Sequence, residues 1–171
     1  VISKALDEVD QAMSTYKPNS EVSLFSKSSN GISVSAPSFY VISVALDIAK
    51  QTNGAFDPTV MPLVNMWGFG PETNSPSAPT DAAIASAMKI CGWQHLQLSN
   101  DSFFVGKDIA ELEIDLSAIA KGFGADNVAA ALDASGVADY MIEVGGEVRV
   151  RGNSGKQRPW RLAIDSPNAK N

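Results

Sequence analysis

The segment that decides the fold is Glu111-Leu-Glu-Ile-Asp115-Leu-Ser-Ala-Ile-Ala-Lys121-Gly122. Apolar residues occupy every second position of its first half, and this alternation predicts a β-strand over 111–116. The second half opens a helix that we expect over 119–135, with Gly136 as its stop. A strand that passes directly into a helix is typical of a chain whose helices pack on a sheet.

Three further helices are predicted nearer the N-terminus. Apolar residues at spacings of four, three and four predict an amphipathic helix over 2–13. Pro37, which suits a first helical turn, and the Asn-Gly pair at 53–54 bound a second helix. The capping residue Thr80 and Gly92 bound a third.

Strands and turns fill most of the remaining chain. Alternating residues predict a hairpin over 96–105, and a cluster of Pro, Ser, Asn and Thr predicts a loop over 71–79. The other predicted strands cover 140–144, 148–151 and 160–165. Helices combined with strands that do not alternate with them indicate an α+β fold, with a mixed or antiparallel sheet and packed helices, in a single domain over 1–171.

Composition excludes several classes of protein. The 171 residues are 44% hydrophobic and 19% charged, with a formal net charge of −6, so the chain is neither disordered nor suited to nonspecific nucleic-acid binding. No apolar run reaches the roughly 18 to 20 residues that a bilayer requires. The chain opens at Val1 in a helical pattern without a signal peptide, and we expect it to be a piece of something longer.

The single cysteine and the single histidine limit the chemistry. Cys91 alone cannot form an intramolecular disulfide, and neither Cys91 nor His95 supports a metal site built from several thiolates or imidazoles. Any metal is therefore expected to be a hard, oxygen-ligated ion such as magnesium or calcium. A catalytic triad would have to use His95, which we expect to be a solvated strand residue because its neighbours alternate. The Gly-Phe-Gly triplets at 68–70 and 122–124 do not extend to a dinucleotide fingerprint or a P-loop.

Two segments with aromatic residues or glycines have two interpretations each. Gly54-Ala-Phe-Asp-Pro-Thr-Val60, ahead of Trp67-Gly-Phe69, is either a helix stop followed by an aromatic loop or a ligand-holding loop with a carboxylate. Glu143-Val-Gly-Gly-Glu147 is either a glycine turn between strands or a place where the backbone approaches a bulky flat ligand. Local pattern leaves both pairs of alternatives open.

The segment from Asp115 to Gly122 is equally ambiguous. It can be a capped helix start, with Ser117 as the cap and Lys121 on the surface. It can also expose free backbone groups while Asp115 and Lys121 flank a phosphate and its metal ion, with Asp126 adding a hydrogen bond.

These motifs occur in a definite order after Met13-Ser-Thr-Tyr16 and Asn19-Ser-Glu-Val-Ser23. Together, over essentially the whole chain, they resemble the ApbE family, the FAD:protein FMN transferases formerly called thiamine-biosynthesis lipoproteins. The resemblance implies an ApbE-like fold and an enzyme that binds FAD and splits its pyrophosphate with Mg²⁺. FMN then passes to a threonine or serine hydroxyl of a target flavoprotein, and AMP is released.

The resemblance also implies roles for individual residues. Tyr16 would lie against the flavin ring, Asp115 would hydrogen-bond the nucleotide, and Lys121 would act at the phosphate or acceptor side. Ala118 would offer its main-chain carbonyl to magnesium. The residues implied to line the FAD pocket are Ala55, Phe56 and Asp57.

The sequence departs from the family pattern in one respect. Family members usually take their base from a His-x-x-Asp-Pro segment and complete the magnesium shell with an Asp and a Thr, and this chain contains no such histidine segment. We therefore expect 1–171 to be the N-terminal and central part of the enzyme, C-terminally incomplete, with little or no FMN transfer of its own.

Location and alternative functions follow from the same resemblance. Family members are commonly lipid-anchored on the periplasmic side of the bacterial inner membrane, and the anchor is absent from this chain. Two alternative functions are a magnesium-dependent FAD pyrophosphatase, which would give FMN and AMP, and a non-catalytic FAD-binding protein.

Overall fold

The computed structural model describes residues 1–71 and 78–164. Its α-helices are α1 (Ile2–Met13), α2 (Glu21–Lys27), α3 (Ala36–Gln51), α4 (Met61–Met66), α5 (Asp81–Ala87) and α6 (Ser117–Ala134). Its strands are β1 (Gly31–Ser33), β2 (Leu96–Ser99), β3 (Phe104–Lys107), β4 (Tyr140–Val144) and β5 (Glu147–Arg151). Short 3-10 turns cover Met88–Ile90, Trp93–His95 and Asn100–Ser102.

The strands form two antiparallel sheets. In the first, β3 lies between β1 and β2, and Val105 is paired with Ile32 on one side and Leu98 on the other. The second is the hairpin β4–β5, whose turn is made by Gly145 and Gly146. Both glycines have positive φ angles, +58° and +94°, which a tight hairpin turn requires. The predicted α+β class is confirmed.

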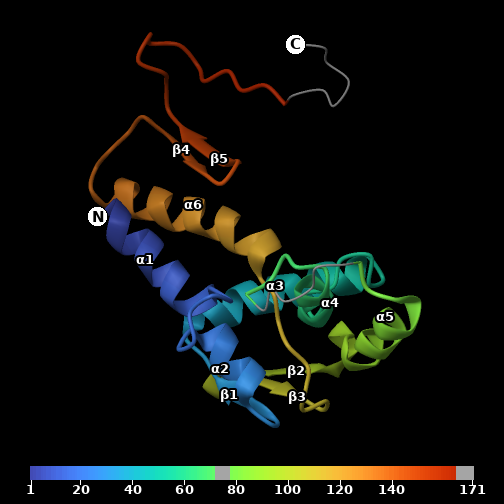
Figure 1. Ribbon diagram of the computed structural model, residues 1–171. Helices are drawn as coiled ribbons and strands as arrows, with labels where there is room; N and C mark the ends of the chain where they lie inside the picture. The colour runs from blue at the N-terminus through green and yellow to red at the C-terminus, as the bar shows by residue number, and fades with distance from the viewer. Residues whose placement is uncertain (72–77, 165–171) are drawn as a thin grey trace.

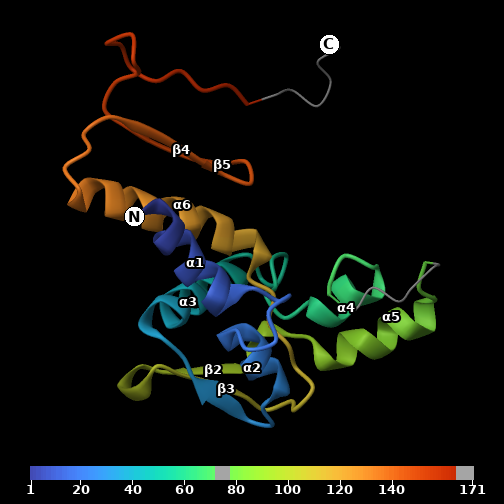
Figure 2. The ribbon, with the colours of Figure 1, turned by 60° about the vertical axis from the view of Figure 1, so that its left-hand side comes forward.

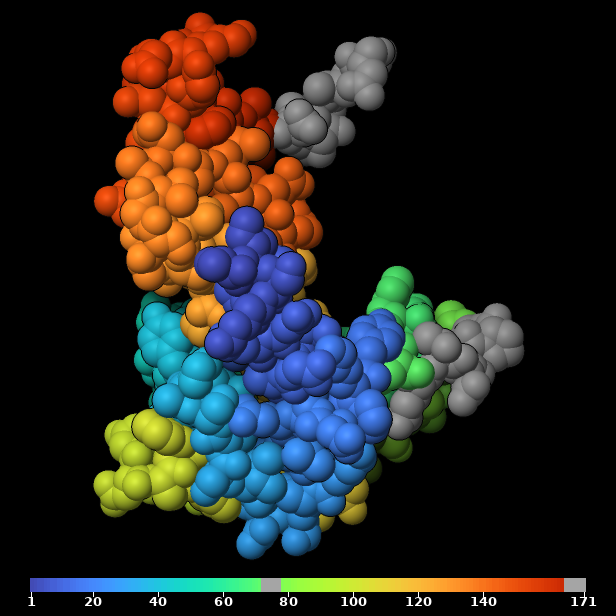
Figure 3. Space-filling model, turned by 90° about the vertical axis from the view of Figure 1, so that its left-hand side faces the viewer, coloured from blue at the N-terminus to red at the C-terminus, as the bar shows by residue number. Residues whose placement is uncertain are grey.

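Helix α6 lies between the hairpin and the helices α1 and α3. It packs against α1, against α3 and against both strands of the hairpin. Figure 1 shows α1 running beside α6 while the hairpin covers another side of α6. Figure 2 shows β2 and β3 at the far end of the molecule from the hairpin. In Figure 3 the orange and red C-terminal part stands above a broad body formed by the blue, cyan and green segments.

Buried side chains fall into two clusters. The larger lies among α2, α3, the three-stranded sheet and the segment before α6; its largest fully buried side chains are Phe25, Leu112, Ile114 and Leu116. The smaller lies between α1, α6 and the hairpin and consists of Ala5, Ala125, Val128, Ala129, Tyr140 and Ile142. Met13 of α1 belongs to the first cluster and Ala5 to the second, so α1 extends along both.

The predicted helices over 2–13 and from Pro37 are confirmed as α1 and α3, and the predicted hairpin is β2–β3. The third helix begins after Thr80, whose hydroxyl oxygen accepts the N–H of Ala83, and ends in a 3-10 turn before Gly92. Two short helices were not predicted. The signals for them were Ser20, which caps α2 by accepting the N–H of Ser23, and the proline in the first turn of α4.

Two predicted strands are wrong in the described part of the chain. Residues 112–116 are alternately buried, but they belong to neither sheet. Their buried side chains are part of the larger cluster, and packing there can bury alternate side chains without strand pairing. Residues 160–164 form no strand either. Helix α6 begins at Ser117, two residues earlier than predicted. Residue 165, and 72–77 of the predicted loop, lie outside the described residues.

None of the described helices combines the length and the apolar character that crossing a membrane requires.

Candidate functional site

The end of α1, the first turns of α6 and the end of β4 surround a hollow of about 500 Å³. Tyr16 lines it from the loop after α1, and Lys121 lines it from α6. Other lining residues are Met13, Ser117, Gly124 and Val144. The structure thus places two predicted site residues that are distant in sequence around one space, which we call the Tyr16–Lys121 hollow.

Tyr16 presents an exposed ring to this hollow. The residue is 68% exposed, and its hydroxyl donates a hydrogen bond to the carbonyl oxygen of Phe69 at 3.2 Å. Its main-chain N–H donates to the Ser14 hydroxyl oxygen at 3.3 Å. An exposed aromatic ring whose hydroxyl is held by a hydrogen bond is suited to stacking on a flat ligand.

Asp115 organises the start of α6. One of its carboxylate oxygens accepts the N–H of Ser117 at 2.8 Å, and its own N–H donates to the carbonyl oxygen of Pro58 at 2.8 Å. The interpretation with Ser117 as the helix cap is therefore wrong: Ser117 is the first residue of α6, Leu116 occupies the cap position without a side-chain cap, and Asp115 accepts the Ser117 N–H. The bond to Pro58 joins the segment 54–60 to the segment 115–122.

Lys121 is exposed in the first half of α6. Its ammonium donates to the Ser117 carbonyl oxygen at 2.9 Å, one helical turn back along the chain. A cation near the N-terminal end of a helix favours an anionic ligand.

The Asp57 carboxylate is bonded within the protein. One oxygen accepts both the N–H and the hydroxyl of Thr59, at 2.8 and 2.7 Å, and the other accepts the N–H of Trp93 at 3.1 Å. The fully buried Thr59 hydroxyl oxygen also accepts the N–H of Gly92 at 2.6 Å. These bonds fasten the segment to the turn at 92–93, and the neighbouring Pro58 carbonyl fastens it to Asp115.

Ala55 and Phe56 take different positions in the same segment. Ala55 is exposed, and Phe56 packs partly buried against the larger cluster. Within the described residues, the lining of the Tyr16–Lys121 hollow includes neither of them, nor Asp57. The structure therefore brings this segment beside Asp115 without bringing its side chains into the hollow.

Ala118 lies on a different side of α6. It lines a separate hollow of about 300 Å³ with Tyr40, Asp126 and Glu147. In residues 1–71 and 78–164, no three His, Cys, Asp or Glu side chains gather as a metal site. A single carbonyl does not hold Mg²⁺, which requires an octahedral oxygen shell. The described residues do not by themselves make up a magnesium site.

The cysteine and the histidine lie apart from this chemistry. Burial raises the pKa of the Cys91 thiol, and the charges of Asp57 and Glu113 raise it further, so the thiol stays protonated at neutral pH. His95 lies in a 3-10 turn just before β2 rather than in the strand, and its Nδ1 is 2.8 Å from an Asp108 carboxylate oxygen.

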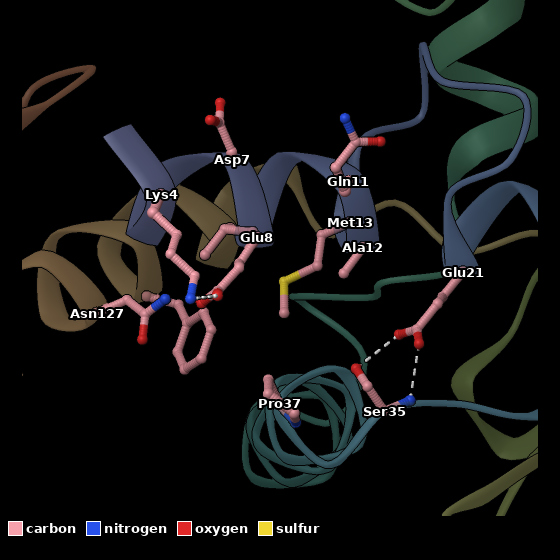
Figure 4. Close-up of a pocket in the computed structure, with 12 residues that line it drawn as sticks. Lys4, Asp7, Glu8, Gln11, Ala12, Met13, Glu21, Ser35, Pro37 and Asn127 are labelled. Atoms are coloured by element: carbon pink, nitrogen blue, oxygen red, sulfur yellow. Dashed lines mark hydrogen bonds and ion pairs between the residues drawn. The ribbon is translucent and has the colours of Figure 1, made fainter. Parts of the chain in front are cut away.

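Another hollow, of about 630 Å³, lies between α1, the start of α3 and the part of α6 around Asn127 (Figure 4). Some of the polar side chains at its edge are paired: Lys4 lies 3.9 Å from Glu8, and Glu21 accepts both the N–H and the hydroxyl of Ser35. Among the described residues, its lining includes none of the predicted site residues.

Two features of the site were not found by sequence reasoning. The bond from Tyr16 to Phe69 joins residues that no local pattern connects. The Thr59 hydroxyl network did have a signal, because an aspartate followed two residues later by threonine is typical of a side-chain-stabilised turn.

Known proteins share both the sequence and the fold. A sequence model described as the ApbE family matches residues 1–171. An FAD:protein FMN transferase of Vibrio cholerae O395 is 44% identical over 168 residues, which are 97% of this chain and 50% of that protein. The Escherichia coli K12 protein of the same name is 38% identical over 173 residues, covering 99% of this chain and 49% of its own length. The chain thus spans about half the length of these curated relatives.

Solved structures agree. The flavin transferase ApbE from Vibrio cholerae matches with a TM-score of 0.93 at 43% identity, covering 97% of this chain and 54% of that one. The apo form of the Pseudomonas stutzeri flavinyl transferase ApbE matches with a TM-score of 0.86 at 32% identity, covering 95% and 54%. The expected ApbE-like fold is confirmed. Since the family model extends over every residue, the chain belongs to the ApbE family.

Proposed function

We propose that the protein containing this chain is an FAD:protein FMN transferase. It splits the pyrophosphate of FAD with the help of Mg²⁺, joins FMN to a threonine or serine hydroxyl of a target flavoprotein, and releases AMP. The observation that carries the proposal is the Tyr16–Lys121 hollow, which is lined by both an exposed aromatic residue and a cation. Family membership and the names of the relatives support this choice of reaction.

The proposed binding mode places the flavin ring on Tyr16 and the diphosphate toward Lys121. Stacking on an aromatic face suits the flat flavin ring. Asp115 orders the start of α6 and hydrogen-bonds the nucleotide. Ala55 and Phe56, which lie outside the hollow, are proposed to border the part of the FAD that extends beyond it. Asp57 supports that border through its bonds to Thr59 and Trp93.

Phosphoryl transfer requires cations because two negatively charged partners meet at phosphorus and charge builds on the departing AMP. The Lys121 ammonium, once released from the Ser117 carbonyl, can donate to a phosphate oxygen, and such charge-assisted bonds are stronger than neutral ones. When bound, Mg²⁺ would neutralise phosphate oxygens, with the Ala118 carbonyl as one ligand. His95 is not proposed as the base for the acceptor hydroxyl, because it does not line the Tyr16–Lys121 hollow and does not belong to a His-x-x-Asp-Pro segment.

We also propose the family's usual location, which is the periplasmic side of the bacterial inner membrane with a lipid anchor. This part rests on the family resemblance alone. Recovery of the native protein in the inner-membrane fraction, with its bulk digestible by protease added to the periplasm, would support it; a cytoplasmic protein would contradict it.

The reaction is tested by incubating the full-length protein with FAD, MgCl₂ and a candidate flavoprotein subunit. Mass spectrometry of the subunit and chromatography of the nucleotides should find FMN on a threonine or serine and an equal amount of AMP. Free FMN and AMP without modified subunit would indicate a pyrophosphatase instead. FAD binding without any release of AMP would indicate a non-catalytic FAD-binding protein.

The role of Lys121 is tested by Lys121→Met against the matched control Lys89→Met. Lys89 is also exposed but lies in the 3-10 turn after α5, away from the hollow. Loss of one charged transition-state contact typically lowers the rate by about 10²- to 10³-fold, and we expect this for Lys121→Met only. Equal rates for the two variants would remove Lys121 from the proposal.

A further inference from the structure

The two glycines of the hairpin turn have different surroundings. A Cβ atom built on Gly145 would lie 2.6 Å from Cδ of Lys121 and 3.5 Å from its Cε. A Cβ built on Gly146 would meet no heavy atom of the described residues within 4 Å. Both glycines are exposed and both have positive φ, so the neighbouring lysine is the main difference between them.

The turn and Lys121 border the same space. The hairpin lies against α6 (Figure 1), and Val144, the residue before the turn, lines the Tyr16–Lys121 hollow together with Lys121. The lysine stem passes next to Gly145, and the ammonium reaches the Ser117 carbonyl at 2.9 Å. The path of the stem into the hollow therefore depends on the absence of a side chain at 145.

We propose that Gly145 is a positioning residue, which leaves the space that the Lys121 stem needs to hold its ammonium in the Tyr16–Lys121 hollow. The consequence for catalysis rests on the proposed function of Lys121. Nonbonded carbons approach to about 3.5 to 4.0 Å, so a methyl group at 145 and the present lysine conformer exclude each other. The exposed lysine can rotate about several bonds, and Lys121 rather than the fold should move.

Backbone strain alone predicts the opposite ranking of the two glycines. A residue with a side chain tolerates the left-handed region near φ of +50° to +70° better than angles beyond it. Gly145 has φ +58° and Gly146 has φ +94°, so strain makes alanine less acceptable at 146. The position of Lys121 makes alanine more harmful at 145.

The first experiment compares Gly145→Ala with Gly146→Ala in the full-length protein, by kcat/KM for FMN transfer and by thermal denaturation. We expect Gly145→Ala to lower kcat/KM by roughly tenfold, because small displacements of a catalytic group are costly, while Gly146→Ala changes it less than about twofold. In a Lys121→Ala background, Gly145→Ala should cause no further loss. Losses that multiply, or a larger loss for Gly146→Ala, would overturn the proposal.

The second experiment follows Lys121 itself. Its side-chain ammonium signal in lysine-labelled NMR spectra is assigned with Lys121→Arg, and it should shift in Gly145→Ala and stay in place in Gly146→Ala. An unshifted signal in Gly145→Ala would refute the positioning role. A shifted signal combined with full transfer activity of Lys121→Ala would uphold the positioning and refute the proposed function of Lys121, so the two failures are distinguishable.

Discussion

The three-stranded sheet and the hairpin β4–β5 are both antiparallel, yet different forces hold them in place. Val105, in the central strand of the first sheet, is fully buried in the larger cluster, whereas every residue of β5 is exposed. The hairpin rests on α6 through Tyr140 and Ile142 and through two exposed ion pairs. Those pairs join Arg149 to Asp126 and Arg151 to Asp133.

The charged groups of the two regions show the same contrast. Lys107, at the end of β3, is buried, and its ammonium donates to the carbonyl oxygens of Leu112 and Ser26 at 2.8 and 3.2 Å. Burial lowers the pKa of Lys107. On α6, hydrogen bonds from Arg151 and Tyr140 lower the pKa of the exposed Asp133. Burial therefore fixes the first region, while salt and acid can loosen the second, which carries the Gly145 side of the hollow.

The largest expected effect on stability comes from a substitution in the larger cluster. Leu112→Ala removes a fully buried side chain from the larger cluster and should lower the free energy of unfolding by about 2 to 5 kcal/mol. Met141→Ala, on the outer face of the hairpin where the side chain is 49% exposed, should change it by about 0.5 kcal/mol or less. Urea denaturation of both variants measures this. Similar losses of unfolding free energy in the two variants would contradict the difference between the buried cluster and the exposed hairpin.

An intermediate effect is expected from Thr59→Val. This substitution keeps the shape of a fully buried side chain but removes the hydroxyl's hydrogen bond to Asp57 and the acceptor for the Gly92 N–H, at a cost of about 1 to 3 kcal/mol. Thr59→Ser keeps the hydroxyl and should retain more stability than Thr59→Val. If valine is tolerated as well as serine, the hydroxyl does not fasten this segment.

The buried lysine predicts a dependence on alkaline pH. Between the lowered pKa of Lys107 and its ordinary value of 10.5, the unfolded chain binds more protons than the folded chain, so this group makes stability rise with pH. Lys107→Met should remove that rise when denaturation is followed across alkaline pH. If the free energy of unfolding depends on alkaline pH in the same way in the unsubstituted protein and in Lys107→Met, Lys107 is not desolvated in the folded protein.

The smallest effect on the stability of the whole molecule is expected from the loss of the Asp133 charge. Its folded-state pKa lies below the ordinary 3.8, so its contribution is complete above that value and is lost as pH falls through the folded-state pKa. Hydrogen exchange, corrected for intrinsic rates, should show β4–β5 amides losing protection in acid or high salt before β3 amides. Asp133→Asn should weaken this dependence. Equal loss of protection in both sheets would contradict it.

Local patterns predicted the elements that depend on local contacts. The apolar spacing of α1 and the capping residue Thr80 specify helices by themselves, and both predictions are confirmed. The alternation of Leu112, Ile114 and Leu116 correctly indicated burial, but burial of alternate residues does not require a paired strand. Pairing depends on a partner elsewhere in the chain, which alternation cannot reveal.

The site shows the same division. The motifs and their order predicted the site residues. The hydrogen bond from the Trp93 N–H to the Asp57 carboxylate, however, depends on a contact between distant segments. The approach of Gly145 to Lys121 likewise requires the hairpin to fold back on α6. The sequence identified Asp57 and Lys121 as candidate site residues, and only the fold shows which neighbours they have.

The most direct test of the central claim is the FAD affinity of Tyr16→Ala, measured by calorimetry on the full-length protein beside Tyr16→Phe. Loss of an aromatic stacking face should raise the dissociation constant of Tyr16→Ala by roughly tenfold, while Tyr16→Phe, which keeps the ring, should stay close to the unsubstituted protein. An unchanged FAD affinity in Tyr16→Ala would contradict the placement of the flavin in the Tyr16–Lys121 hollow.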